Sequence, residues 1–172
     1  GLIGQNGAVK TTALQSMLNL VHPGGGVIEM FGRDFAENEA ECKQKIGVVL
    51  GEIDFYSHKK LLSISAVTKR FYPKWDEAAY QKYLSLFDLD PQKQVKPLSS
   101  GMKVKSILAL ALSHHAQLLI LDEPTSGLHP VSRAALLAPF RNLVESGERS
   151  ILFSPHLTPP LEKPAADIAP TQ

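Results

Sequence analysis

A short aliphatic run that ends in two carboxylates constrains the fold of this chain more than any other feature. Residues 118–121 are Leu, Leu, Ile and Leu, and Asp122, Glu123 and Pro124 follow directly. A continuous apolar run of this length is typical of a strand that is buried on both faces, as in parallel sheets covered by helices. In such open sheets, ligands bind at the carboxyl ends of the strands. The run therefore predicts a buried strand that carries two acidic side chains to a ligand-binding edge.

The two carboxylates call for a chemical role, because burying charged groups without a partner is costly. We expect Asp122 to hold a magnesium ion, as the aspartate at this kind of strand end does in enzymes that act on nucleoside triphosphates. Glu123 is then free to polarise a water molecule. The plainer alternative is a strand that ends in an acidic turn.

Alternating strand and helix patterns surround this run. Apolar spacing and breakers predict helices over residues 11–21, 102–113 and 132–145, and strands over residues 27–31, 46–50, 118–121 and 150–154. Pro23 and the glycines after it are expected to stop the first helix. This alternation predicts an α/β fold, with a parallel sheet flanked by helices.

The stretch from about residue 58 to 96 has a different pattern. Aromatic and small apolar residues recur there at steps of three and four, which predicts an inserted amphipathic helical region: Tyr72, Trp75, Ala79, Tyr80, Tyr83 and Phe87. We expect this stripe to pack in the core rather than to bind a ligand.

Composition narrows the class of protein. The chain has 172 residues, of which 44% are hydrophobic and 20% charged, and its formal net charge is +1. These values suit one globular α/β unit and give no reason to expect a nucleic-acid partner. The single cysteine, Cys42, cannot form an internal disulfide, which suits the cytosol. No apolar run reaches the roughly twenty residues that a membrane span needs, so any membrane contact is expected to come through a partner.

A glycine-rich segment at the amino end of the chain nearly fits the P-loop pattern. In that pattern, backbone amides at a helix N-terminus surround phosphates, the lysine reaches the β and γ phosphates, and the threonine binds magnesium. The corresponding residues are Gly4, Gln5, Asn6, Gly7, Ala8, Val9, Lys10, Thr11 and Thr12. Val9 is the one mismatch, since the pattern has glycine there; a β-branched residue resists positive φ and adds bulk beside the phosphates. A plain glycine-rich turn before a helix would explain this segment alone about as well.

Further motifs lie around the acidic strand. Leu98-Ser99-Ser100-Gly101-Met102 precedes it, Thr125-Ser126-Gly127-Leu128-His129-Pro130 follows it, and His156 comes after a predicted strand. Together with the P-loop segment, this set resembles the ATP-binding subunit of ABC transporters over nearly the whole chain. In that comparison the glycine-rich segment resembles the Walker A motif, residues 98–102 the signature motif, residues 118–124 the Walker B strand, residues 126–130 the D-loop, and His156 the switch histidine.

The resemblance implies a P-loop NTPase sheet with an inserted helical signature subdomain. Residues 1–172 would form a single domain fragment, with residues 1–56 and 116–172 as the nucleotide-binding core and residues 57–115 as the helical subdomain. Only Gly1 to Ile3 precede the glycine-rich segment, and prolines crowd residues 155–170. We therefore expect the chain to be a piece of a longer domain, from which most of the strand that enters the P-loop is missing.

The resemblance also implies an activity. ATP and Mg²⁺ would be the cofactors, with Thr11 and Asp122 at the metal and Ser99 and Gly101 contacting the ATP of a second subunit. Glu123 would act as general base and His156 would contact the γ phosphate. ATP hydrolysis would drive a membrane permease, with export as the expected direction.

The implied partners are the transmembrane permease subunit and a second ABC ATPase subunit, in a homodimer or a heterodimer. The implied location is cytoplasmic, peripheral on the cytoplasmic face of the plasma membrane. The sequence departs from the family pattern at four places: Val9, Gly51-Glu52, where only Glu52 can stand in for a glutamine near the metal, His129 in place of aspartate, and Pro155 before the switch histidine.

Two other functions remain open from the sequence. These departures would suit an impaired subunit that binds nucleotide or a partner without efficient hydrolysis. An ABC-type ATPase outside transport is the other alternative, although the chromosome-structuring relatives insert long coiled coils where this chain has only a compact helical stretch.

Overall fold

A three-stranded parallel sheet forms the centre of the computed structural model. The structure describes residues 2–3, 7–22, 24–50, 56–125, 149–154 and 169–170, with the backbone alone for residues 2–3, 7–10 and 169–170. The strands lie in the order β4 (Ile46–Val49), β5 (Leu118–Asp122) and β6 (Ser150–Ser154). Leu118 is in register with Ile46 on one side and with Ser150 on the other. The predicted parallel sheet is confirmed, and the predicted strand bounds hold to within one residue at each of these three strands.

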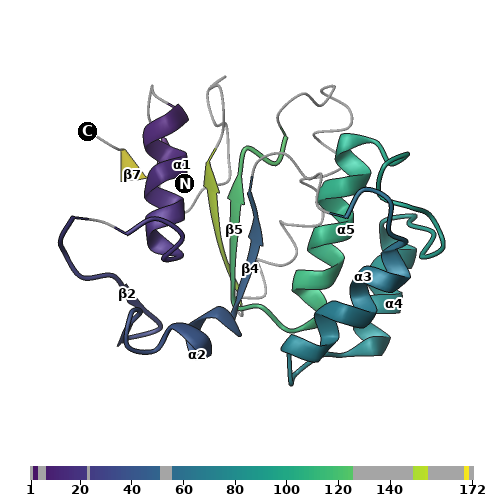
Figure 1. Cartoon of the computed structure of the whole chain (residues 1–172), viewed down its shortest axis with the longest axis horizontal. Coiled ribbons are helices and arrows are strands. Elements are labelled where there is room, and N and C mark those ends of the chain that lie inside the picture. Colours follow the sequence, from purple (N-terminus) through teal and green to yellow (C-terminus); the bar gives the residue numbers. More distant parts are fainter. Residues whose placement is uncertain are drawn as a thin grey trace.

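The central strand β5 supplies side chains to both faces of the sheet. Leu119 and Leu121 pack into one apolar core, which they share with the long helix α5 (Ser100–Ser113), whereas Ile120 packs into a second core with Leu14 of α1 (Gly7–Met17). All three β5 side chains are fully buried. This burial on both faces is why the strand is a continuous aliphatic run rather than an alternating one. Figure 1 shows α1 on one side of the sheet and α5 on the other.

Helix α1 begins four residues earlier and ends four residues earlier than the apolar spacing predicts. It ends at Met17 because Asn19 adopts a left-handed conformation, with φ of 56°. The amide of Leu20 donates to the carbonyl of Gln15, and that of Asn19 donates to Ser16. This is a Schellman motif, in which asparagine takes the place that glycine usually fills. The stop predicted at Pro23 is therefore wrong, since Asn19 ends the helix first.

A small hairpin and a short helix follow α1 in the chain and precede the first strand of the central sheet. Strands β2 (Glu29–Met30) and β3 (Arg33–Asp34) pair antiparallel. Strand β2 is shorter than the strand predicted over residues 27–31. Helix α2 (Glu39–Lys43) follows and buries Cys42 in the α1 side of the core. Sequence analysis did not predict α2, because five residues give too few apolar positions to show a helical period.

Helices cover the other face of the sheet. These are α3 (Leu61–Thr68), the short 3₁₀ helix η1 (Lys69–Phe71), α4 (Glu77–Leu86) and α5. Asp76 is the N-cap of α4, and its carboxylate accepts a hydrogen bond from the amide of Ala79 at 2.9 Å. The predicted helical region is confirmed. Its aromatic stripe packs in the core as predicted, since Tyr80 and Phe87 are buried and Trp75 and Tyr83 pack against them.

A two-residue strand lies at each end of the chain. Strand β1 (Leu2–Ile3) pairs in parallel with β7 (Ala169–Pro170), so the residues before the glycine-rich segment are extended. The predicted helix over residues 132–145 lies outside the described residues. Within the described part of the chain, no helix is long and apolar enough to cross a membrane.

Candidate active site

Two of the predicted site residues lie in contact where α1 packs against the carboxyl end of β5. The hydroxyl of Thr11, in α1, donates a hydrogen bond of 2.7 Å to Oδ2 of Asp122, which is 111 residues further along the chain. Asp122 is the last residue of β5 and is only 4% exposed. Two residues that the sequence assigned to one metal ion are thus in direct contact.

The second carboxylate oxygen of Asp122 is also buried, but it has no hydrogen-bond partner among the described residues. An ionised carboxylate accepts hydrogen bonds at both of its oxygens, and leaving one buried without a partner is costly. Magnesium prefers oxygen ligands and is usually held by one or two carboxylates together with substrate phosphates, rather than by a full cage of protein ligands. No group of three or more metal-binding side chains occurs in the described residues. Thr11 and Asp122 therefore fit a magnesium ion that shares its coordination with a phosphate.

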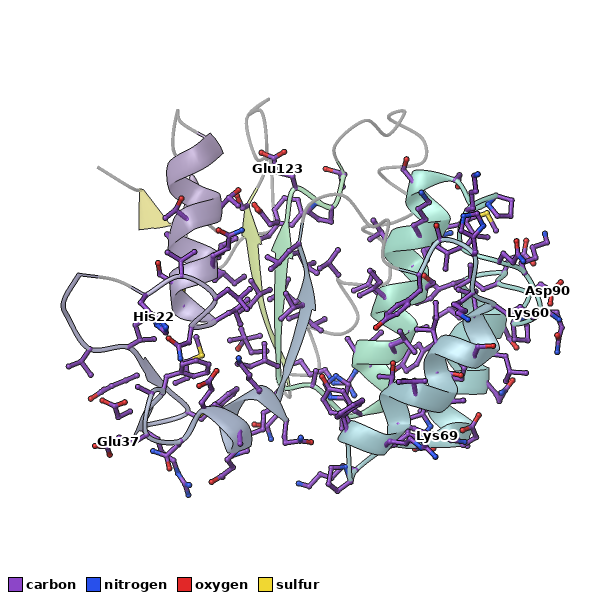
Figure 2. All side chains as sticks on the ribbon, in the orientation of Figure 1. His22, Glu37, Lys60, Lys69, Asp90 and Glu123 are labelled. Carbon is purple, nitrogen blue, oxygen red and sulfur yellow. The ribbon has the colours of Figure 1, made fainter. Side chains whose placement is uncertain are left out.

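Glu123 lies just beyond the end of β5, where the chain turns. Its φ is 48°, a left-handed conformation that is uncommon for a residue other than glycine. The amide of Glu123 donates to the carbonyl of Ser154 in β6 at 3.0 Å, which holds this turn in place. Figure 2 shows the Glu123 side chain beyond the upper ends of β5 and β6, at the edge of the sheet. Unusual backbone conformations of this kind cluster at functional sites, although each costs on the order of 1 kcal/mol.

The glycine-rich segment is described only in part. Gly7, Ala8, Val9 and Lys10 form the first turn of α1, but their side chains, and all of Gly4, Gln5 and Asn6, lie outside the described residues. Since Val9 has a helical backbone, a positive φ is not needed at this position. That part of the objection to Val9 is wrong, while the effect of its bulk stays a prediction. Thr12 is exposed on α1.

Ser99 and Gly101 lie at the start of α5. The hydroxyl of Ser99 accepts a hydrogen bond from the amide of Met102 at 3.3 Å, so Ser99 is the N-cap of this 14-residue helix. Only four residues connect the end of α5 to the start of β5, so the two run in opposite directions. The N-terminus of α5 therefore lies at the same end of the molecule as Asp122, but on the opposite face of the sheet from α1 (Figure 1). Within this chain, the structure does not bring Ser99 together with Thr11.

The remaining predicted site residues, Glu52 and His156, lie outside the described residues, as do Gly51, His129 and Pro155. Of the other histidines, His114 is buried: it stacks on Tyr72 with ring centroids 3.8 Å apart. His114 is therefore a core residue.

Sequence analysis missed one polar group at this edge. Ser154 is the last residue of β6, its side chain is fully buried, and it is in register with Asp122. The signal in the sequence was weak, because a serine at the end of a strand is common. Only the register of the two strands shows that it neighbours Asp122.

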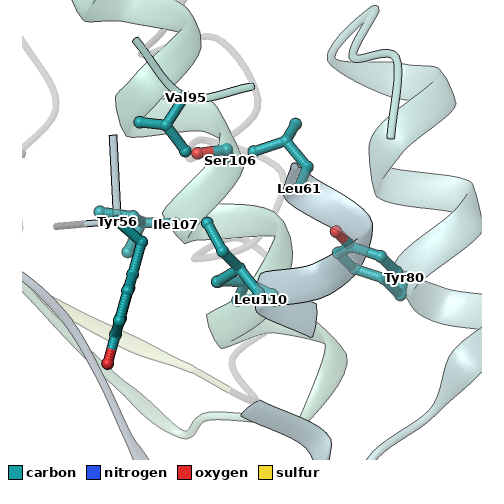
Figure 3. A pocket seen from close by; sticks show the side chains of 8 residues that line it. Tyr56, Leu61, Tyr80, Val95, Ser106, Ile107 and Leu110 are labelled. Atoms are coloured by element: carbon teal, nitrogen blue, oxygen red, sulfur yellow. The ribbon is translucent and has the colours of Figure 1, made fainter. Parts of the chain in front are cut away.

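Two cavities lie away from this edge. One, of about 160 Å³, lies among the helices and is lined mainly by apolar side chains of α3, α4 and α5, including Leu61, Tyr80 and Leu110 (Figure 3). The other, of about 360 Å³, is lined by Met17, Phe31 and residues at the amino ends of β5 and β6. Neither is lined by Thr11, Asp122 or Glu123, so the candidate site rests on the contacts of its own residues.

Comparison with known proteins places this geometry in a family. The sequence pattern of the ABC transporter family matches residues 1–126, which include both Thr11 and Asp122. The chain belongs to the ABC transporter family.

Individual relatives agree with this assignment. The chain is 32% identical over 165 residues to the bacitracin transport ATP-binding protein BcrA of Bacillus licheniformis, covering 95% of this chain and 54% of the relative. It is 33% identical over 172 residues to the Nod factor export ATP-binding protein I of Burkholderia lata, covering 95% of this chain and 55% of the relative. The chain thus spans about half the length of these curated relatives.

Solved structures share the fold. An ATP-binding subunit of an ABC transporter superposes with a TM-score of 0.76 at 28% identity, covering 91% of this chain and 67% of that chain. An ABC transporter ATP-binding protein from Pyrococcus furiosus also superposes with a TM-score of 0.76, at 22% identity, covering 98% of this chain and 82% of the other. The fold is that of the P-loop NTPases in this family.

Proposed function

We propose that this chain is the nucleotide-binding part of an ABC transporter ATPase, which couples ATP binding and hydrolysis to export by a membrane permease. The hydrogen bond between Thr11 and Asp122 carries this proposal, because it joins a helix N-terminus suited to phosphates to a strand end suited to magnesium. A relative named for bacitracin transport supports a role in transport, and one named for Nod factor export supports its direction.

In this proposal, different residues at the carboxyl edge of the sheet bind the phosphates and the metal ion. The first turn of α1, with Lys10, receives the β and γ phosphates, since the positive end of the helix and its free amides favour anions. Thr11 and Asp122 hold the magnesium ion, which neutralises phosphate charge. Glu52 would add a further oxygen near the metal.

Glu123 acts as the general base that takes a proton from the attacking water. Its position supports the role, since the amide of Glu123 is held by the carbonyl of Ser154 and its side chain lies beyond the end of β5, at the edge of the sheet (Figure 2). His156 contacts the γ phosphate from the segment that follows β6.

The N-terminus of α5, with Ser99 and Gly101, faces the ATP of a second subunit in a head-to-tail dimer. The geometry that supports this role is the placement of α5 across the sheet from α1, with both helix N-termini at the same end. Such a dimer, either of two copies or with a sister chain, docks on a permease at the cytoplasmic face of the plasma membrane.

The test is the magnesium dependence of nucleotide binding by the full-length protein. Thr11→Val removes the hydroxyl and keeps the shape of the side chain, whereas Thr11→Ser keeps the hydroxyl. We expect Thr11→Val to raise the magnesium concentration needed for half-maximal binding of a fluorescent ATP analogue by at least about tenfold, and Thr11→Ser to resemble the wild type. Equal magnesium dependence in all three proteins would remove Thr11 from the metal site, and with it the contact that carries the proposal.

A further inference from the structure

Two buried polar atoms at the site edge lack a partner in the described part of the chain. They are Oδ1 of Asp122 and the hydroxyl oxygen of Ser154. Asp122 is 4% exposed and Ser154 is fully buried, so bulk water does not solvate either side chain well. Leaving such groups unpaired costs about 1–3 kcal/mol each.

The two atoms belong to side chains on the same face of the sheet. Asp122 and Ser154 are paired in register on the neighbouring parallel strands β5 and β6. Side chains alternate along a strand, and Ile120 and Leu152, two residues earlier on each strand, both pack into the α1 side of the core. Leu121 and Phe153, one residue earlier, pack on the α5 side. Ser154 therefore lies on the α1 side, beside the carboxylate that Thr11 contacts.

A single shared partner would satisfy both atoms. Neighbouring strands lie about 4.8 Å apart, so a water molecule fits as a bridge between side chains at paired positions. Such a water donates one hydrogen to the carboxylate and the other to the hydroxyl oxygen. Magnesium keeps several waters when it binds to proteins, and groups that orient those waters tune its affinity.

We propose that Ser154 is a positioning residue for magnesium: its hydroxyl and Oδ1 of Asp122 together hold one water of the hydration shell of the ion. This inference rests on the proposed function, since it places the metal at Thr11 and Asp122. It adds a third element, β6, to the metal site. The same residue then positions two groups, because its carbonyl also holds the amide of Glu123.

Magnesium titrations of the full-length protein test this role, with a fluorescent ATP analogue as the probe and EDTA as the metal-free baseline. Ser154→Ala removes the hydroxyl but keeps the backbone bond to Glu123. Ser154→Thr and Ser154→Val form a pair of matched size, of which only the first keeps a hydroxyl. Ser113→Ala is the control, since Ser113 is an equally buried serine in α5, where its hydroxyl donates to the carbonyl of Ala109.

We expect Ser154→Ala and Ser154→Val to need about tenfold more magnesium for half-maximal binding, with metal-free nucleotide affinity unchanged. Ser154→Thr and Ser113→Ala should follow the wild type. If metal-free melting experiments show that Ser154→Ala is unfolded, the comparison of Ser154→Thr with Ser154→Val tests the proposal instead.

A titration of Ser154→Ala that overlays the wild type, or equal titrations of Ser154→Thr and Ser154→Val, would overturn the proposal. If Thr11→Val still shifts the titration in that case, the proposed function stands and only the role of Ser154 is lost. If neither Thr11→Val nor Ser154→Ala shifts it, the metal site itself is wrong.

Discussion

The imidazole of His114 lies flat against the ring of Tyr72, with the centroids 3.8 Å apart and the planes inclined by 16°. His114 follows the end of α5, and Tyr72 follows η1, so the contact ties the connection between η1 and α4 to the end of α5. Burial lowers the pKa of His114 from 6.5 to about 4, with a smaller contribution from the nearby His115 and Arg149, while a hydrogen bond to the backbone of Gln44 acts in the opposite direction.

This depressed pKa predicts that the fold loses stability in mild acid. Below about pH 6.5 the unfolded chain protonates His114, while the folded chain does not until about pH 4. The unfolded state therefore binds more protons in this window, and the free energy of unfolding falls as the pH falls through it, by up to roughly 3 kcal/mol. Urea denaturation between pH 7.5 and pH 4.5 measures this slope. His114→Phe should flatten it, and an unchanged slope in that variant would assign the acid sensitivity to other groups.

Glu123→Gln should separate binding from hydrolysis. The amide keeps the size of the side chain but cannot take a proton, so ATP turnover should fall by at least about a hundredfold. Nucleotide affinity should stay the same, because the proposed phosphate and metal ligands are untouched. Steady-state phosphate release and equilibrium binding measure the two quantities, with the exposed Glu77→Gln as control. Normal turnover in Glu123→Gln would exclude Glu123 as the base.

Ser99 has two roles that substitutions can separate. Ser99→Ala loses the N-cap of α5 and should lower the free energy of unfolding by about 1 kcal/mol. Ser99→Asp keeps a capping oxygen and should keep stability, but it places a negative charge where a γ phosphate is expected, so turnover should collapse. Asp76→Ala is the matched control, since it removes the cap of α4 and should lower stability without lowering turnover. Full turnover in Ser99→Asp would argue against a phosphate at this helix end.

Gly47 should tolerate no side chain. A Cβ at this position of β4 would lie 2.5 Å from Cβ of Ala111 and 2.7 Å from Cδ2 of Leu119, closer than real atoms approach. Gly47→Ala should therefore cost about 1–3 kcal/mol in the free energy of unfolding, measured by chemical denaturation. Gly24→Ala is the control, because a Cβ at Gly24 would meet no atom within 4 Å and the loop is exposed. Equal stability of both variants would show that α5 can shift away from the sheet.

The sequence predicted those parts of the fold that local patterns determine. The apolar run of β5 and the helical spacing of α5 are such patterns, and both elements lie within two residues of the predicted bounds. Thr11 and Asp122 could be assigned to one site because each sits in a motif whose chemistry needs the other.

Other features depend on tertiary contacts or on single backbone angles. The end of α1 was misplaced because an asparagine, not a glycine or proline, adopts the left-handed conformation there. Ser154 was missed as the neighbour of Asp122 because the sequence of one strand does not determine its register with another. The pairing of the two residues appears only in the structure, where β5 and β6 lie side by side.

The arrangement of α1 and α5 has an electrostatic consequence for assembly. Both helices point their N-termini toward the end of the sheet where Asp122 lies, and each such end carries about half a positive charge. In the proposed head-to-tail dimer, two copies that approach through this end would bring four positive helix ends toward the same space. The negative phosphates of a nucleotide bound there would be attracted to the helix ends of both copies, so in that dimer the nucleotide itself would hold the two surfaces together.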